Sequence, residues 1–409
     1  MSSLTFLGGA GEVGRSGILF EDDKKILLDY GIKIHEKTDY PLPFQGFLNA
    51  LIISHAHLDH SGFSPAAYES QSPLCFGTYP TQALSSLLIK DSMKVQKLRR
   101  ERQQFSSSDF KRMLHAYVPL PYDTRHNLSR SNSRFTRMDH LSETNRSLSF
   151  SLRDAGHILG SSLVEVNYKN KKLVYTGDFK LGETRMHRGA RLIKDVDVLI
   201  IESTYSDRDH PDRKELEKRL HYEVREVIER GGNVLFPAFA VGRSQELLQI
   251  LHAMKEDFPV YLDGMAKTAS EISLDYPSYM KDARAFRESL GEAKFVMFEA
   301  HRRRALSEPS VIVSTAGMLE GGPAMGYIPR LNKNSKIILT GYQIPDTNGW
   351  HLLNQKTVRA DGLEFKVEIP VEYLDLSAHA GRSDLLKFIS AAAPEKIFCV
   401  HGDHCDKFA

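Results

Sequence analysis

Three histidines and an aspartate stand within six positions of the stretch LIISHAHLDHSG, residues 51–62. The aliphatic run before them predicts a buried strand, and in extended backbone His55 and His57 can reach one point together. Asp59 and His60 follow after a turn and can reach a second point nearby. Imidazole nitrogens and carboxylate oxygens are ligands of zinc and related divalent cations, so this spacing predicts a metal site.

Further candidate ligands stand at the ends of other strand-like runs. His157 lies in a glycine-flanked loop, Asp178 ends the run KLVYTGD, and His401 ends the run KIFCVHG. Asp29 ends KKILLD and is better suited to orienting a ligand histidine than to binding a cation. Each residue alone is more often an ordinary loop residue. Together they are expected to meet at the mouth of one sheet.

The elements that must position these residues alternate between strands and helices, which predicts an α/β protein. Short aliphatic runs that read as strands recur along the whole chain. Apolar spacing with a period of 3.6 residues, closed in the first case by two glycines, predicts helices over residues 214–232 and 242–256. Another helix is expected near residues 382–392.

The order of the predicted strands and helices changes along the chain. Up to about Glu202 strands dominate, and they are expected to pair as hairpin-like neighbours. From about Tyr205 to Asp346 strands and helices alternate, which predicts a parallel sheet. The Ser-, Arg- and Asn-rich residues 127–147 are expected to form a long surface loop.

The composition excludes several classes of protein. Of 409 residues, 41% are hydrophobic and 26% are charged, as in folded globular proteins and unlike disordered chains. The longest apolar run is far shorter than the roughly 18 residues of a spanning helix, and the first residues lack a secretory signal. Three scattered cysteines do not make a disulfide framework or a thiolate zinc site, so we expect a reducing cytoplasm.

Charge is informative only where it clusters. The net charge of +2, from 54 basic and 52 acidic residues, does not by itself indicate a nucleic-acid binder. Basic side chains gather, however, at residues 97–102, 124–138 and 301–304. One such cluster is usually a solvated surface, but three of them indicate a polyanionic partner.

The series GGAGEVGRSG, Asp29, HAHLDH, His157 and TGD resembles the motif series of the metallo-β-lactamase fold. The chain also resembles the nucleic-acid branch of that fold, the β-CASP nucleases, which includes the pre-mRNA 3′-end cleavage subunit, its archaeal and bacterial relatives, and RNase J. The narrower match rests on Glu202 in IIESTY, His379 in LSAHAGRSD and His401 in VHGD. The stretches PAFAVGRSQELL and VSTAGMLEGGPA resemble the inserted β-CASP domain.

The resemblance implies an α/β fold in which an αββα sandwich is interrupted by a β-CASP domain, a parallel sheet with flanking helices. The discontinuous metallo-β-lactamase domain would comprise residues 1–203 and 376–409. The β-CASP domain would comprise residues 204–375.

The resemblance also implies two Zn²⁺ ions per chain. One ion would be held by three histidines, the second by an aspartate and two histidines, and a second aspartate would bridge the two: His55, His57 and His157; Asp59, His60 and His401; and Asp178. Such a pair activates water for in-line attack on phosphorus. The expected catalytic residues are His379 as general acid, Glu202 as the partner of its other ring nitrogen, and Asp59.

The function implied is hydrolysis of single-stranded RNA, in processing or decay. Cleavage would be endonucleolytic, 5′ to 3′ exonucleolytic or both, and would leave a 5′-phosphate and a 3′-hydroxyl. Candidate RNA contacts are Arg243, Ser314, Thr315 and Gly317, although an ordinary turn and a solvent-facing arginine explain them equally well. A homodimer or an RNA-processing complex is open.

Two alternative functions remain. A DNA nuclease of the same superfamily is the nearest, and DNA-directed relatives tend to carry valine at the position of His401. A non-catalytic RNA-binding scaffold belongs to a different class, but such paralogues lose metal ligands, whereas every ligand position is filled here.

Overall fold

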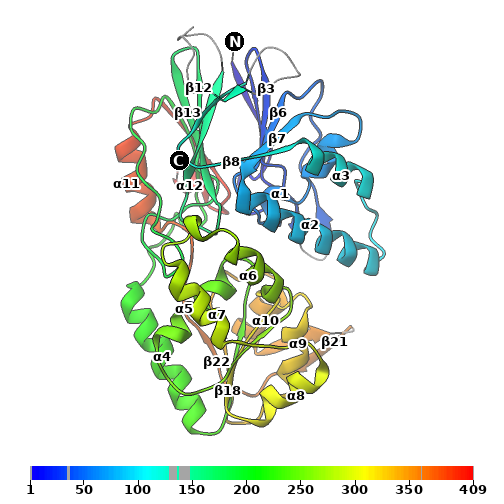
Figure 1. The fold of residues 1–409 in the computed structure, drawn as a ribbon, viewed down its shortest axis with the longest axis vertical. Coiled ribbons are helices and arrows are strands. Elements are labelled where there is room, and N and C mark those ends of the chain that lie inside the picture. The colour runs from blue at the N-terminus through cyan, green and yellow to red at the C-terminus, as the bar shows by residue number, and fades with distance from the viewer. Residues whose placement is uncertain (1, 35–36, 129–135, 138–147, 361, 409) are drawn as a thin grey trace. The chain divides into compact units, whose positions relative to one another are not determined.

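A computed structural model of the chain describes residues 2–34, 37–128, 136–137, 148–360 and 362–408. The chain forms two compact units (Figure 1). Unit 1 comprises Met1–Glu183, His187–Asp209 and Ala378–Ala409, and unit 2 comprises Thr184–Met186 and His210–Ser377. The domain boundaries inferred from the sequence stay a prediction.

Unit 1 contains two sheets. The strands of the first sheet, in spatial order, are β1 (Ser3–Gly8), β2 (Gly17–Glu21), β3 (Lys25–Leu28), β6 (Ala50–Ile52), β7 (Leu74–Thr78) and β8 (Tyr117–Leu120). The first three strands are antiparallel neighbours, as predicted. The next three add in parallel, so the expected hairpin-like pairing is wrong there. The expectation failed because parallel neighbours are joined by long crossover connections, which the order of strand-like runs does not reveal.

The second sheet is completed by the C-terminal part of the chain. Its strands, in spatial order, are β10 (Thr136–Arg137), β9 (Arg125–Asn127), β11 (Ser149–Asp154), β12 (Ser162–Tyr168), β13 (Lys171–Tyr175), β14 (Val198–Glu202) and β23 (Lys396–Val400). Strands β14 and β23 pair in parallel. Strand β10 lies inside the segment predicted as a loop, most of which falls outside the described residues.

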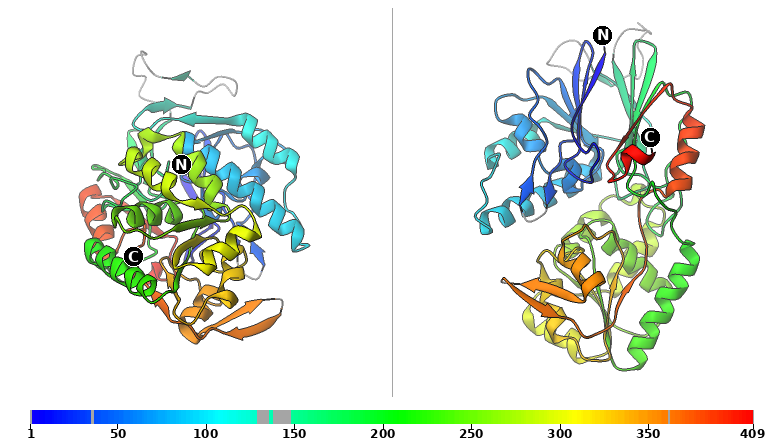
Figure 2. Two further views of the ribbon diagram at one scale, coloured as in Figure 1. Left: turned by 60° about the horizontal axis from the view of Figure 1, so that its bottom comes forward. Right: turned by 180° about the vertical axis from the view of Figure 1, so that it is seen from behind.

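Helices cover the outer face of each sheet, α2 (Tyr79–Leu98) and α3 (Ser107–Ala116) on the first and α11 (Arg382–Ala392) on the second (Figure 2, right). Aliphatic and aromatic side chains from both sheets fill the space between them, for example Phe20, Phe76, Phe150 and Ile200. The predicted αββα sandwich is therefore confirmed. Helix α2 was not predicted, because its buried face includes polar residues such as Thr81, Ser85 and Gln96 that blur the apolar period.

Unit 2 is built on one parallel sheet with the strand order β17 (Lys294–Phe295), β16 (Val260–Asp263), β18 (Ser310–Ser314), β15 (Asn233–Pro237), β19 (Lys336–Leu339) and β22 (Val371–Tyr373). Every pairing in it is parallel, which confirms the prediction from the strand–helix rhythm. Its central strands are buried along their whole length, as expected for a sheet covered on both faces.

The helices of unit 2 are α4 (Arg213–Glu229), α5 (Arg243–Ala253), α6 (Ala266–Leu274), α7 (Ala283–Glu292), α8 (Glu299–Ser307), α9 (Pro323–Tyr327) and α10 (Asn348–Gln355). Helix α4 ends just before the pair Gly231 and Gly232 that was expected to stop it, and α5 ends about three residues earlier than predicted. The first of them stops because Gly231 adopts a positive φ of 75°. A separate antiparallel hairpin consists of β20 (Thr357–Ala360) and β21 (Leu363–Lys366). Within the described part of the chain, no helix is long and apolar enough to span a membrane.

The packing of helix α11 against the second sheet is expected to depend on one aromatic contact. Phe388 of α11 is fully buried, and its ring centroid lies 5.0 Å from that of Phe179. We predict that Phe388→Ala lowers the free energy of unfolding by about 3–5 kcal/mol. Leu386→Ala is the matched control, because Leu386 is 45% exposed on the same helix, and should change it by about 0.5 kcal/mol or less. Denaturant unfolding of both variants would contradict this prediction if their midpoints coincided.

Candidate metal centre

The stretch between residues 51 and 62 leaves the first sheet after β6 and turns into the short helix α1 (Leu58–Ser61). His55 and His57 lie in the connecting loop, whereas Asp59 and His60 lie on α1. Gly31 packs directly against this helix, and a Cβ atom there would lie 1.8 Å from the carbonyl oxygen of Asp59. The absence of a side chain at Gly31 therefore lets α1 bring both of its polar residues to the sheet edge.

The other sequence-predicted residues of unit 1 follow strands of the second sheet or precede α11. His157 lies between β11 and β12, Asp178 follows β13, and Glu202 ends β14. His379 precedes α11, and His401 follows β23. His401 has a positive φ of 51°, a conformation uncommon for residues other than glycine and concentrated at functional sites.

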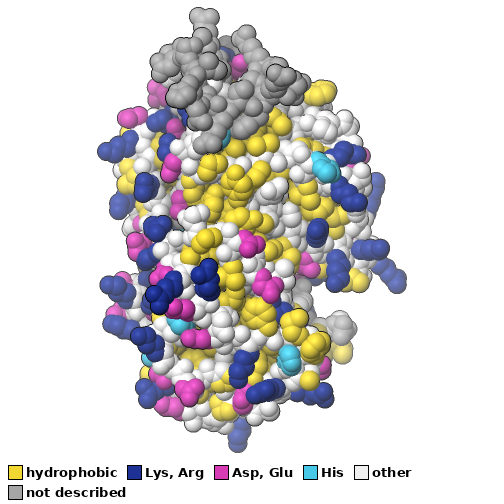
Figure 3. All heavy atoms as spheres, viewed as in Figure 1, with side chains coloured by type: hydrophobic (Ala, Val, Ile, Leu, Met, Phe, Trp, Pro, Cys, Tyr) yellow, Lys and Arg dark blue, Asp and Glu magenta, His cyan; other side chains and the backbone are white. Residues whose placement is uncertain are grey.

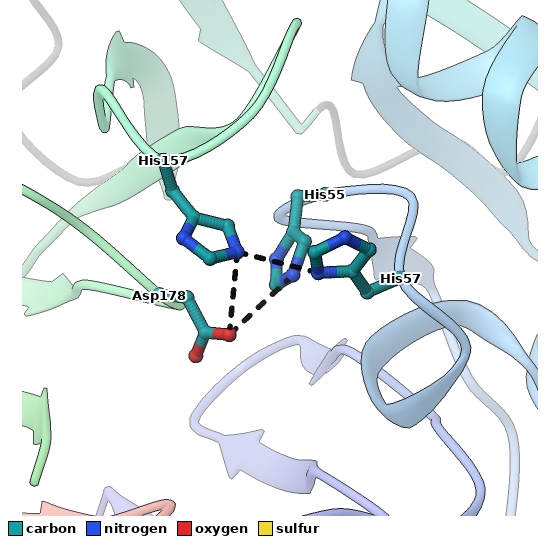
Figure 4. A group of neighbouring side chains, drawn as sticks. All are labelled: His55, His57, His157 and Asp178. Carbon is teal, nitrogen blue, oxygen red and sulfur yellow. Dashed lines mark hydrogen bonds and ion pairs between the residues drawn. The ribbon is translucent and has the colours of Figure 1, made fainter. Parts of the chain in front are cut away.

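The first group of side chains consists of His55, His57, His157 and Asp178, which all lie close enough to share one cation (Figure 4). The Oδ2 atom of Asp178 lies 3.6 Å from Nε2 of His55 and 3.7 Å from Nε2 of His157. Nε2 of His157 lies 3.2 Å from Nδ1 of His57. The three imidazoles thus converge on one oxygen of the carboxylate.

The second group consists of Asp59, His60, His401 and again Asp178. The other carboxylate oxygen of Asp178, Oδ1, lies 3.3 Å from Nε2 of His60 and 3.5 Å from Nδ1 of His401. Oδ2 of Asp59 lies 3.1 Å from Nε2 of His401. Asp178 therefore offers one oxygen to each group, which is the geometry that a bridging ligand needs.

The residues present fit a cation, because several buried candidate ligand atoms have no hydrogen bond. Within the described residues, Nε2 of His55, Nε2 of His60 and Oδ1 of Asp178 are buried without a hydrogen bond. A buried polar atom without a partner costs about 1–3 kcal/mol, so three of them at one place are rare unless something else binds there. A divalent cation at each group would satisfy these atoms.

The charges at the site lead to the same conclusion. Burial lowers the pKa of His55 and that of His157 well below the usual value, so both imidazoles are neutral, as a metal ligand must be. Burial also disfavours a charge on His60, but the carboxylates of Asp178 and Asp59 outweigh it and raise its pKa. The buried carboxylates thus attract positive charge, which either a proton or a cation can provide.

Asp29 occupies the position that its expected role requires. Its Oδ2 atom accepts a hydrogen bond from Nδ1 of His60 at 2.7 Å and another from the hydroxyl of Tyr175 at 2.7 Å. Its carboxylate also accepts hydrogen bonds from the backbone N–H of Ser54 and from its hydroxyl, at 2.6 and 2.7 Å. This arrangement directs Nε2 of His60 toward Asp178 and fixes the tautomer of the ring.

His379 and Glu202 form a pair at the edge of the cluster. Nδ1 of His379 lies 2.9 Å from Oε2 of Glu202, and Asp178 is 4.0 Å from the same nitrogen. The carboxylate of Glu202 is fully buried and also accepts hydrogen bonds from Phe179 N–H and the Thr204 hydroxyl. Burial lowers the pKa of His379, but the negative charges of Glu202 and Asp178 outweigh it and raise that pKa to about 9.

The structure also identifies supporting residues that the sequence analysis missed. Thr204 lies 3.2 Å from Nδ1 of His401, Ser54 lies 3.1 Å from Nδ1 of His55, and the carbonyl of Ala378 lies 3.0 Å from Nδ1 of His157. Lys180 donates a hydrogen bond to the carbonyl of His379 at 3.1 Å. The available signal was adjacency, since each of these residues stands within two or three positions of a predicted site residue.

The four predicted RNA contacts all lie in unit 2. Arg243 is the first residue of α5 and is half-buried. Ser314 is the last residue of β18, and Thr315 and Gly317 follow it, all three buried. They stand at the carboxyl edge of the parallel sheet.

Comparisons with known proteins agree with this geometry. Residues 18–203 match the model of the metallo-beta-lactamase superfamily domain, and residues 244–352 match that of the Beta-Casp domain. Residues 364–409 match the model described as a Zn-dependent metallo-hydrolase RNA specificity domain. A crystal structure of a protein of unknown function from Enterococcus faecalis V583 has the same fold, with a TM-score of 0.59 at 15% identity over 99% of this chain and 95% of that chain.

Curated relatives cover almost the whole chain. A probable RNase from Methanocaldococcus jannaschii is 35% identical over 98% of this chain and 93% of its own length. The RNase aCSPSF2 from Saccharolobus solfataricus is 34% identical over 98% and 79%, respectively. The transcription termination factor FttA from M. jannaschii is 34% identical over 99% and 68%. The chain therefore belongs to the β-CASP family of metallo-β-lactamase-fold hydrolases.

Proposed function

We propose that this protein is a zinc-dependent ribonuclease that hydrolyses phosphodiester bonds of single-stranded RNA and leaves a 5′-phosphate and a 3′-hydroxyl. The observation that carries the proposal is the position of Asp178, whose two oxygens each face a separate set of three metal-ligand side chains. Two relatives that match 98% of this chain are named as RNases, which supports RNA as the substrate. The three cysteines are free, which is compatible with a reducing cytoplasm.

Two Zn²⁺ ions are the proposed cofactors, and each would take one of the two groups. His55, His57 and His157 would hold one ion, and the second would be held by Asp59, His60 and His401, with Asp178 shared. Bound there, such ions would lower the pKa of water and stabilise the charge that develops on a phosphate. Three imidazoles in the first group favour zinc over magnesium, which prefers oxygen ligands.

The proposed role of His379 is to protonate the ribose oxygen that leaves. Glu202 holds Nδ1, so the remaining ring nitrogen is the one that can give a proton to a substrate atom. The carboxylate stabilises the imidazolium and keeps the acid form populated at neutral pH. The hydrogen bond from Lys180 to the His379 carbonyl and that from the Phe179 N–H to Glu202 fix the position of this acid.

The proposed RNA contacts of unit 2 rest on the edge of its parallel sheet. Ligands of open α/β sheets bind at the carboxyl ends of the strands, where neighbouring connections run in opposite directions. Strand β15 lies between β18 and β19. The chain leaves β15 toward β16 and leaves β19 toward β22, so the connections diverge at these two neighbouring strands. Within the described residues, the hydroxyls of Ser314 and Thr340, in and next to the ends of β18 and β19, are buried without a hydrogen bond, and a phosphate oxygen that reached them would supply the missing acceptor.

A DNA nuclease is the alternative that the same chemistry allows, because both backbones carry phosphodiesters. His401 favours RNA, since the DNA-directed members that this chain resembles tend to carry valine at that position, and here His401 contacts both Asp59 and Asp178. Incubation with single-stranded RNA labelled at the 5′ or 3′ end, beside DNA of matched sequence, decides between them. The fragment pattern also separates endonucleolytic from 5′ to 3′ exonucleolytic cleavage.

The first prediction from this proposed function concerns the metal. Chelation should abolish RNA cleavage, and mass spectrometry of the native protein should find two zinc ions per chain. Asp178→Asn should reduce the bound zinc and the activity together, because it weakens a ligand shared by both groups. His252→Ala is the control, since that histidine pairs with Glu292 in unit 2. Full turnover in metal-free protein would refute the proposal.

The second prediction concerns the general acid. His379→Ala should slow RNA cleavage by about 10²–10⁴-fold, the usual effect of losing a positioned acid, while the zinc content stays unchanged. Single-turnover cleavage rates and zinc analysis of the same sample test both parts. Loss of zinc in this variant would instead assign His379 to the ligands.

The third prediction concerns pH. Cleavage that needs protonated His379 should decline as pH rises through its pKa, which the neighbouring carboxylates raise. Glu202→Gln removes one of these charges, lowers that pKa, and should move the alkaline decline of the rate to lower pH. Bound cations lower the pKa in both proteins, so the difference between their pH–rate profiles is the quantity to measure. Identical alkaline limbs with unchanged zinc content would exclude the assigned role of Glu202.

A further inference from the structure

The hairpin of β20 and β21 projects from the body of unit 2 and takes no part in its main sheet (Figure 2). Val358 on β20 is buried in the core of unit 2, and this contact anchors the hairpin. On β21, by contrast, Leu363 is 62% and Phe365 is 48% exposed. In the space-filling view, hydrophobic side chains reach the margin of the molecule where Figure 1 labels β21 (Figure 3). Exposed apolar residues on an edge strand are usually avoided, because such a strand pairs with other chains.

The outer edge of β20 is closed by a side chain. Arg359 donates its backbone N–H to Oδ1 of Asn348 at 2.6 Å, and Nδ2 of Asn348 donates to the carbonyl of Arg359 at 3.0 Å. The carboxamide thus takes the place of a neighbouring strand. Any further strand must therefore add at β21.

The backbone register shows which groups β21 offers. Arg359 stands opposite Glu364, and its backbone groups point away from β21, toward Asn348. The pair is therefore of the non-hydrogen-bonded kind, so the N–H and C=O of Glu364 point to the open edge, as do those of Lys366 two positions on. Nothing in the described part of the chain forms a hydrogen bond with these backbone groups.

The sequence of β21 is complementary to itself. In an antiparallel pairing centred on Phe365, Glu364 would stand opposite Lys366 of the partner subunit, and Lys366 opposite the partner's Glu364. These are the positions whose backbone groups point outward, so the hydrogen bonds and the charge pairs arise in the same register. The two Phe365 rings would meet on the two-fold axis and lose contact with water.

We propose that two copies of this chain pair through the open edges of their β21 strands, so that the two hairpins form one four-stranded antiparallel sheet. Such a contact is isologous, as in most homodimers, because each strand presents the same residues to the other. The charge pattern selects a second copy as the occupant over a strand of another protein.

Sedimentation of the full-length protein over a range of concentrations tests the pairing. The average mass should rise from 46.2 kDa toward twice that value. Lys366→Glu should remove the rise, because it places two glutamates opposite each other, and the double variant Glu364→Lys/Lys366→Glu should restore it by exchanging the charges. Lys333→Glu, an exposed charge reversal elsewhere in unit 2, is the matched control and should behave as the native protein does. A dimer that persists in Lys366→Glu, or a protein that stays monomeric, overturns the proposal.

Cross-linking tests the register independently. Phe365→Cys should form an intermolecular disulfide on mild oxidation, since residues facing each other in a non-hydrogen-bonded pair have Cα atoms about 4.5 Å apart. Leu363→Cys is the control, because the residue is more exposed but would lie ~14 Å along the strand from its own copy. Equal cross-linking of both variants, or of the native protein with its three cysteines, would contradict the register. Recovery of a different protein on a monomeric chain would contradict the choice of partner.

Discussion

Everything at the site depends on the burial of carboxylates inside unit 1. Asp29, Asp178 and Glu202 have almost no exposed surface, and moving a charged group out of water costs several kcal/mol unless opposite charge or hydrogen bonds compensate it. Asp29 receives four hydrogen bonds and Glu202 is paired with His379. Asp178 is different, because it faces imidazole nitrogens on both sides and one of its oxygens has no hydrogen bond within the described residues.

This difference distinguishes the carboxylates that position other side chains from the carboxylate that can bind a metal ion. Asp29 and Glu202, which are fully hydrogen-bonded, hold other side chains in position, whereas Asp178, which is incompletely hydrogen-bonded, stands between the two groups of candidate metal ligands. The histidines follow a similar rule, because Nδ1 of His60 and of His157 is held by the protein and Nε2 of both rings faces Asp178. The fold therefore determines which nitrogen of each ring faces the centre of the site.

The sequence was sufficient to name candidate metal ligands but not the residues that hold them in position. His55, His57, Asp59 and His60 could be found because their spacing is local, and the remaining candidates because each ends a strand-like run. Tyr175 and Thr204 stand near predicted site residues, but local spacing does not show their roles, since a hydroxyl becomes a partner of Asp29 or His401 only when distant strands meet. Helix α2 was missed because polar residues occupy its buried face, and the parallel strands of the first sheet because pairing depends on crossovers that no local pattern records.

The place of β23 in the second sheet has a consequence for the synthesis of the protein. Almost all of unit 2, residues 210–377, leaves the ribosome between β14 and the strand that pairs beside it, β23. His401 emerges about 340 residues after Asp59, which it contacts. A nascent chain halted just before β23 contains five of the six candidate ligands around Asp178 but lacks His401, so it cannot assemble the second group. Translation products of this nuclease that end before β23 therefore lack a complete metal-binding site.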